Sequence, residues 1–178
     1  MKTTQILIAG FGGQGILFAG KFLAYKGLTE DLQVSWLPSY GPEMRGGTAN
    51  CNVILSDTPV GSPIITEPDV LVAMNLPSLQ KYVDTVASGG QIYVDSALIE
   101  EKVIRNDVEV FYIPATQMAK NEGISTLANM IIMGHMLENN KELSFNGTEE
   151  VVKKLVPPTK AALVELNIKA LTLGKEYK

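Results

Sequence analysis

A short apolar run followed at once by a glycine-rich turn constrains the fold of this chain more than any other feature. The run covers residues 6–9, and the turn is Gly10-Phe11-Gly12-Gly13-Gln14-Gly15. A helix-compatible stretch then extends from residue 16 to residue 26. A strand, a tight turn and a helix in this order are typical of the first unit of an α/β domain with a parallel sheet.

Further apolar runs and helical patterns predict the rest of the fold. Strands are predicted at residues 33–37, 49–55, 70–74, 91–94 and 108–113. A helix at residues 77–87 is expected to link two parallel strands, and after residue 113 the pattern is helical only, at residues 115–122, 126–137, 147–155 and 158–174. We therefore predict an α/β fold, a three-layer α/β/α Rossmann-like domain with a mainly parallel sheet and a helical C-terminal third. A mixed sheet is also consistent with the sequence, because the strand predicted at 49–55 closely follows a glycine-rich loop and can run antiparallel to its neighbours.

Length and composition limit the classes of function. The 178 residues, 46% of them hydrophobic, are expected to form a single domain over residues 1–178. The net charge of −4 comes without a Lys/Arg run, which argues against nucleic acid or a membrane as partner. The first apolar run is too short for a signal peptide or a spanning helix, so we expect a cytoplasmic protein. Cys51 is the one cysteine of the sequence, so an intrachain disulfide is excluded. A single cysteine also cannot hold an iron–sulfur cluster by itself.

The glycine turn is the first candidate site. Gly10, Gly12 and Gly15 have the G-x-G-x-x-G spacing, which lets the backbone approach an anion at a helix N-terminus. A classical NAD site needs an acidic residue after the second strand, where this chain has Leu37-Pro38-Ser39 instead. The alternative is a tight turn that serves only close helix–strand packing. The candidate binding residues here are Gly10, Gly12, Gly13, Gln14 and Gly15.

The second candidate site is the segment Ser39-Tyr40-Gly41-Pro42-Glu43-Met44-Arg45-Gly46-Gly47. It follows the second predicted strand, where ligand crevices open in α/β sheets. Arg45 can hold a phosphate or carboxylate in a bidentate fork. An equally good alternative is a local ion pair between Glu43 and Arg45 on a surface loop. The candidate binding residues here are Ser39, Tyr40, Gly41, Glu43, Arg45 and Gly46.

Taken together, these segments resemble the gamma subunit, or gamma-like domain, of the pyruvate/2-oxoacid:ferredoxin oxidoreductases. The similarity also covers Glu67-Pro68-Asp69-Val70-Leu71-Val72-Ala73-Met74 and Ala128-Asn129-Met130 with Gly134. The form Ser-Tyr-Gly-Pro-Glu-x-Arg-Gly-Gly is closest to the 2-oxoglutarate and 2-oxoisovalerate types.

The resemblance implies oxidative decarboxylation of a 2-oxoacid to an acyl-CoA, with electrons passed to ferredoxin. Thiamine diphosphate, magnesium and iron–sulfur clusters would then be held by partner subunits, since this chain lacks cluster cysteines and a thiamine diphosphate motif. The implied partners are alpha and beta subunits and a ferredoxin-like delta subunit. The implied role of this chain is assembly and a contribution to the coenzyme A site, without catalytic residues or a metal of its own.

Three alternatives remain open from the sequence: the small subunit of indolepyruvate:ferredoxin oxidoreductase, a stand-alone nucleotide-binding module, and a purely structural subunit. Two residues with reactive side chains are interpreted as packing residues. His135 lies in an almost wholly apolar helical stretch, and Cys51 lies in a predicted strand. Asp95 ends a predicted strand at a ligand-facing edge but can equally cap the next turn, so it is not counted in the site.

Overall fold

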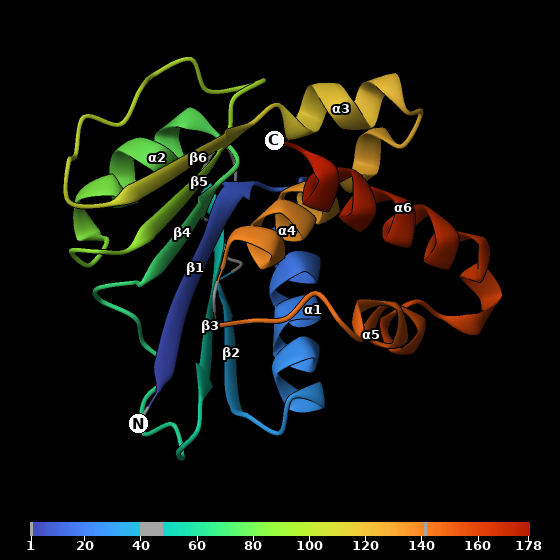
Figure 1. Cartoon of the computed structure of the whole chain (residues 1–178), viewed down its shortest axis with the longest axis horizontal. Helices are drawn as coiled ribbons and strands as arrows, with labels where there is room; N and C mark the ends of the chain where they lie inside the picture. Colours follow the sequence, from blue (N-terminus) through green and yellow to red (C-terminus); the bar gives the residue numbers. More distant parts are fainter. Residues whose placement is uncertain (1, 40–47, 141) are drawn as a thin grey trace.

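The fold is built on one mixed sheet of six strands (Figure 1). The computed structural model describes residues 2–39, 48–140 and 142–178. The strands lie in the order β2-β3-β1-β4-β5-β6. Their bounds are β1 Thr3–Phe11, β2 Gln33–Ser39, β3 Thr48–Ser56, β4 Val70–Ala73, β5 Gln91–Asp95 and β6 Glu109–Ile113.

Strand directions confirm the mixed sheet. β4 is parallel to β1, β5 to β4 and β6 to β5. β3 pairs antiparallel with both β1 and β2, so β2 runs in the same direction as β1. The carboxyl ends of β1, β2, β4, β5 and β6 therefore share one edge of the sheet, at which β3 begins.

The two faces of the sheet are covered unequally (Figure 1). One face carries α1 (Ile16–Thr29) and the C-terminal helices, and the other carries α2 (Leu76–Tyr82), the 3-10 turn η2 (Val83–Thr85) and the connection between β5 and β6. The C-terminal elements are α3 Ala115–Asn121, η3 Ser125–Leu127, α4 Ala128–Asn139, α5 Thr148–Leu155, η4 Pro158–Lys160 and α6 Ala162–Glu176. These bounds confirm the predicted three layers and the helical C-terminal third.

Side-chain alternation along the strands divides the core into two parts. Ile8 and Val72 point into the large cluster beneath α1, α4 and α6, while Leu7 and Leu71 point into the smaller cluster beneath α2. All four residues of β4 are buried, as expected of a central parallel strand that is covered on both faces.

The helix predicted at residues 77–87 is shorter than expected. α2 ends at Tyr82 and continues as the 3-10 turn η2. The Thr85 hydroxyl donates a hydrogen bond to the carbonyl of Tyr82, which satisfies an acceptor that a continuing helix would use. Every helix among the described residues falls short of the length and apolar character that a membrane-spanning segment requires.

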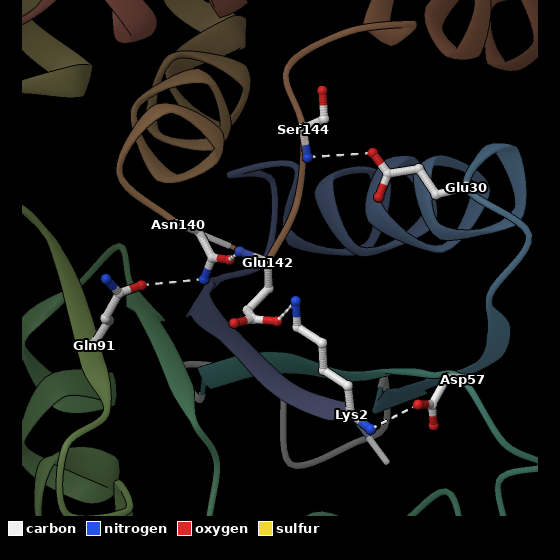
Figure 2. Close-up of polar contacts among 7 residues, drawn as sticks. All are labelled: Lys2, Glu30, Asp57, Gln91, Asn140, Glu142 and Ser144. Carbon is white, nitrogen blue, oxygen red and sulfur yellow. Dashed lines mark hydrogen bonds and ion pairs between the residues drawn. The ribbon is translucent and has the colours of Figure 1, made fainter.

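The connection from α4 to α5 is fastened at the amino-terminal edge of the sheet (Figure 2). The Asn140 amide donates to Gln91 Oε1 at 3.1 Å, and Glu142 forms an ion pair with Lys2. Farther on, the backbone N–H of Ser144 donates to Glu30 Oε1 at 3.2 Å, at the end of α1. These contacts hold the segment that leads into α5 against both the sheet and α1.

Candidate functional site

The glycine turn lies at the crossover point of the sheet. β1 is followed by α1 on one face, and its neighbour β4 is followed by α2 on the other face. In open α/β sheets a crevice forms where neighbouring strands send their connections to opposite faces, and ligands bind there. The turn Gly10–Gly15 joins β1 to α1 at this point, as the sequence predicts.

Backbone geometry explains why this turn needs glycine. Gly13 and Gly15 have φ angles of 92° and 74°, which other residues adopt at a cost. A Cβ atom on Gly10 would lie 2.6 Å from Gln14 Oε1 and 3.1 Å from the Cβ of Met74. A Cβ atom on Gly13 would meet nothing within 4 Å, so Gly13 borders open space.

The Gln14 side chain points into the protein and holds the turn. Its Oε1 accepts a hydrogen bond from the N–H of Phe11 at 2.6 Å, and its Nε2 donates to the carbonyl of Met74 at 2.9 Å. Gln14 therefore ties the turn after β1 to the end of β4, and both polar ends of its amide are engaged by the backbone.

The N-terminus of α1 is available to an anion. Gly15 is its N-cap and provides no side-chain hydrogen bond, and the first turn contains no acidic residue. The N–H groups of the first helical turn lack acceptors within the helix, and the helix dipole adds partial positive charge. Anion binding by the glycine turn stays a prediction, and these features are its structural basis.

Asn129, at the start of α4, contacts the N-cap residue of α1. Its Nδ2 donates to the carbonyl of Gly15 at 3.0 Å, and its Oδ1 is buried without a hydrogen-bond partner. A Cβ atom on Gly15 would lie 2.5 Å from Asn129 Nδ2. Gly15 therefore has to be glycine for two reasons, its φ angle and this close approach.

A cavity of about 170 Å³ opens beside the turn. It brings together the ends of β1 and β4 and the starts of α3, η3 and α4. Its volume suits a small group and not a whole dinucleotide. Its lining residues are Gly13, Gln14, Met74, Leu98, Thr116, Ser125, Thr126 and Ala128.

Asp95 is buried at the end of β5 and fastens α3 to the sheet. Its carboxylate accepts hydrogen bonds from the Thr116 hydroxyl at 2.6 Å and from the N–H groups of Thr116 and Ala97. Burial raises the pKa of Asp95, and the hydrogen bonds from Thr116 and Ala97 act in the opposite direction. These contacts position Thr116, which lines the cavity.

The second predicted segment begins at the same edge of the sheet. Ser39 pairs with Asn50 on β3, and Asn50 pairs with Ala9 on β1, so Ser39 lies in the row that leads into the glycine turn. Ser39 is exposed. Of the other predicted binding residues, Tyr40, Gly41, Glu43, Arg45 and Gly46 lie outside the described residues, and their part in a site stays a prediction.

Both residues interpreted as packing residues are buried. His135 lies between the rings of Tyr93, Phe111 and Tyr177, and burial lowers its pKa. Cys51 is fully buried, and burial raises the pKa of its thiol to about 12. Such a thiol is protonated and unreactive at neutral pH.

Comparison with known proteins identifies the family. Residues 5–177 match the profile of the family described as pyruvate ferredoxin/flavodoxin oxidoreductase. The chain belongs to this family. The match covers almost the entire sequence, which agrees with the resemblance carried by the glycine turn and the segment that begins at Ser39.

Three family members illustrate how the domain is used. A gamma subunit of a keto/oxoacid ferredoxin oxidoreductase from Geobacter sulfurreducens superposes with a TM-score of 0.83 at 32% identity, over 97% of this chain and 96% of the other. Ketoisovalerate oxidoreductase subunit VorA from Methanothermobacter thermautotrophicus is 38% identical over 177 residues. A 2-oxoglutarate:ferredoxin oxidoreductase from Magnetococcus marinus, with 2-oxoglutarate, coenzyme A and succinyl-CoA bound, gives a TM-score of 0.88 at 26% identity.

Coverage differs among these members of the oxidoreductase family. The chain spans 36% of the length of VorA and 31% of the Magnetococcus marinus chain, while 97% and 98% of its own residues are matched. The same domain thus occurs in relatives as a separate chain and as part of a chain about three times as long.

Several residues around the crevice were not predicted as site residues. Asn129 belongs to a segment that carries the family resemblance, so this segment was the available signal for it. Thr116, Ser125 and Thr126 carry no local signal, because only the packing of α3 and η3 against the sheet brings them to the cavity.

Proposed function

We propose that this chain is the gamma-type subunit of a 2-oxoacid:ferredoxin oxidoreductase and that its glycine turn forms part of the coenzyme A site. The observation that carries the proposal is the uncapped N-terminus of α1 at the crossover crevice, in a chain that belongs to this family. The Magnetococcus marinus relative, whose structure contains coenzyme A, supports coenzyme A as the ligand.

The chain contributes binding groups and not the reacting cofactor. The first N–H groups of α1, with Gly13 at the open side of the turn, receive a phosphate of coenzyme A, and Arg45 adds a cation from the neighbouring segment. The single buried thiol cannot hold an iron–sulfur cluster. Thiamine diphosphate, magnesium and clusters are therefore assigned to partner subunits, where thiamine diphosphate would supply the electron sink for decarboxylation.

The proposed substrate is 2-oxoglutarate or a branched-chain 2-oxoacid, in line with the Magnetococcus marinus enzyme and VorA. Assays of the complex, purified without oxygen, against pyruvate, 2-oxoglutarate, 2-oxoisovalerate and indolepyruvate test this choice. The highest kcat/KM for pyruvate or indolepyruvate would contradict it.

A charge placed at the turn tests the coenzyme A site. Gly13→Asp sets a carboxylate in open space beside the N-terminus of α1, and we expect the KM for coenzyme A in the assembled enzyme to rise about tenfold or more. Asp tolerates a positive φ better than most residues, which limits the strain. Gly147→Asp is the matched control, because Gly147 also has a positive φ and open surroundings but lies at the start of α5.

The outcomes are separable. A higher KM for coenzyme A in Gly13→Asp and Arg45→Ala, with the KM for the 2-oxoacid unchanged, supports the proposal. An unchanged KM for coenzyme A in both variants removes the glycine turn from the site and leaves a purely structural subunit.

A further inference from the structure

The edge formed by β2 and β3 has the character of an interface. Neither strand contains a Lys, Arg, Asp or Glu residue, in a chain with 19% charged residues. Among the described strands β2 ends the order, and every residue of β2 is exposed or only half-buried. Natural proteins usually protect a free sheet edge with charges, because an uncharged edge invites another polypeptide to pair with it.

The face of β2 that points away from α1 is also thinly covered. Leu37 pairs with Asn52, which pairs with Leu7, a member of the core cluster beneath α2. Leu37 therefore points to the α2 side, yet α1, on the opposite face, is the helix that contacts β2 and β3 substantially. Leu37 is 39% exposed.

Another apolar side chain extends this area. Phe11 is 43% exposed where β1 enters the glycine turn. Trp36 is also 37% exposed, but it pairs with the buried Val53 and lies on the opposite face, against Gly20 of α1. Phe11 alternates with Leu7 along β1 and so lies on the same side as Leu37. We call Leu37 and Phe11, with the outer edge of β2, the β2 surface. Uncharged surfaces rich in aromatic and aliphatic residues are typical of the centres of protein interfaces.

We infer that the β2 surface is the docking site of the larger partner subunit, the chain that corresponds to the remainder of the long relatives. The inference rests on the proposed function. In VorA and the Magnetococcus marinus enzyme this domain is about a third of a longer chain, so in those relatives it is joined to additional protein. The β2 surface reaches the crevice at Phe11, so a partner docked there would also border the candidate coenzyme A site.

A second copy of this chain fits the surface less well. Proline has no N–H, so Pro38 fits the ladder only with its nitrogen turned away from β3. The outward-facing backbone groups are then those of Val34, Trp36 and Pro38, and Pro38 lacks the donor. An antiparallel pairing of β2 with β2 of a second copy would therefore form only a very short ladder of hydrogen bonds.

Two leucines of equal exposure provide the test. Leu37→Glu places a carboxylate in the β2 surface, and Leu163→Glu places one on α6, where the leucine is also 39% exposed. Each variant is expressed with an affinity tag in the source organism, and the complex is purified without oxygen. Circular dichroism and urea unfolding of each chain alone establish that both variants fold.

We expect about tenfold less of the larger chains, of thiamine diphosphate and of iron to co-purify with Leu37→Glu than with the wild type. The reason is that an unpaired carboxylate in an interface is strongly unfavourable. Leu163→Glu should match the wild type. Equal co-purification of the larger chains with both variants would rule out the β2 surface as their docking site. The proposed function would not be affected by this result. A dimer of the lone chain that Leu37→Glu separates, with recovery of larger chains unchanged, assigns the surface to a second copy. A wild type that brings no larger chain and no coenzyme A-dependent 2-oxoacid oxidation overturns both proposals.

Discussion

The side-chain amide of Asn129 donates a hydrogen bond to the carbonyl of Gly15, at 3.0 Å and across 114 residues of sequence. This contact joins the helical C-terminal third to the turn that begins α1. The position of the candidate anion site therefore depends on α4 as well as on the local glycines.

Replacement of Asn129 by alanine should loosen the glycine turn. Asn129→Ala removes one hydrogen bond, and we expect the free energy of unfolding to fall by about 1–2 kcal/mol. Amide hydrogen exchange at residues 12–15 should quicken in the same variant. Asn167→Ala is the matched control, because Asn167 is also buried and its amide donates to the carbonyl of Leu163 in its own helix. Equal exchange at residues 12–15 in both variants would contradict a role for Asn129 in positioning the turn.

Local sequence patterns were sufficient to predict the strands, most helices and the glycine turn, because hydrophobic alternation and glycine placement act over a few residues. The antiparallel direction of β3 stayed open, since a run such as residues 49–55 has the same pattern in either direction. The bond from Asn129 to Gly15 was beyond prediction because it depends on the packing of distant elements. The inward orientation of Gln14 was also missed, since its partner Met74 lies 60 residues away.

Close packing of α4 against α6 should make two glycines sensitive to any added atom. A Cβ atom on Gly134 would overlap the carbonyl of Leu171, and one on Gly174 would overlap the carbonyl of Ile131. We expect Gly134→Ala and Gly174→Ala each to lower the free energy of unfolding by about 1–3 kcal/mol, measured by urea denaturation. Gly61→Ala, at a site with no atom within 4 Å of the added carbon, should be nearly neutral. Equal stabilities of the three variants would refute the close helix contact.

Cys51 should be unreactive in the folded chain. Its thiol is buried and donates a weak hydrogen bond to the carbonyl of Ile16, and burial raises its pKa to about 12. A thiol-specific reagent at pH 8 should therefore label the native protein far more slowly than the urea-unfolded protein, because the thiolate is the reacting species. Rapid, complete labelling under native conditions would show that β3 and α1 do not enclose this side chain as described.

The environment of His135 should make folding less favourable in mild acid. Burial lowers the pKa of His135 below its ordinary value of 6.5, so the unfolded chain binds more protons at this residue as the pH falls from about 6.5. The contribution to stability is present above pH 6.5 and is lost as the pH falls through the lowered pKa. Asp95, whose pKa is raised, acts in the opposite direction as the pH falls through that raised pKa.

The His135→Phe variant isolates this effect, because phenylalanine keeps an aromatic ring between Tyr93, Phe111 and Tyr177 and cannot bind a proton. We expect the free energy of unfolding of the wild type to fall more steeply than that of the variant as the pH falls below about 6.5. The absolute stability of the variant also reflects the lost contact between His135 Nδ1 and the carbonyl of Gly174, so the slope and not the value is diagnostic. Parallel pH curves for the two proteins would mean that His135 titrates alike in the folded and unfolded chains, and its burial between α4, α6 and the sheet would then be wrong.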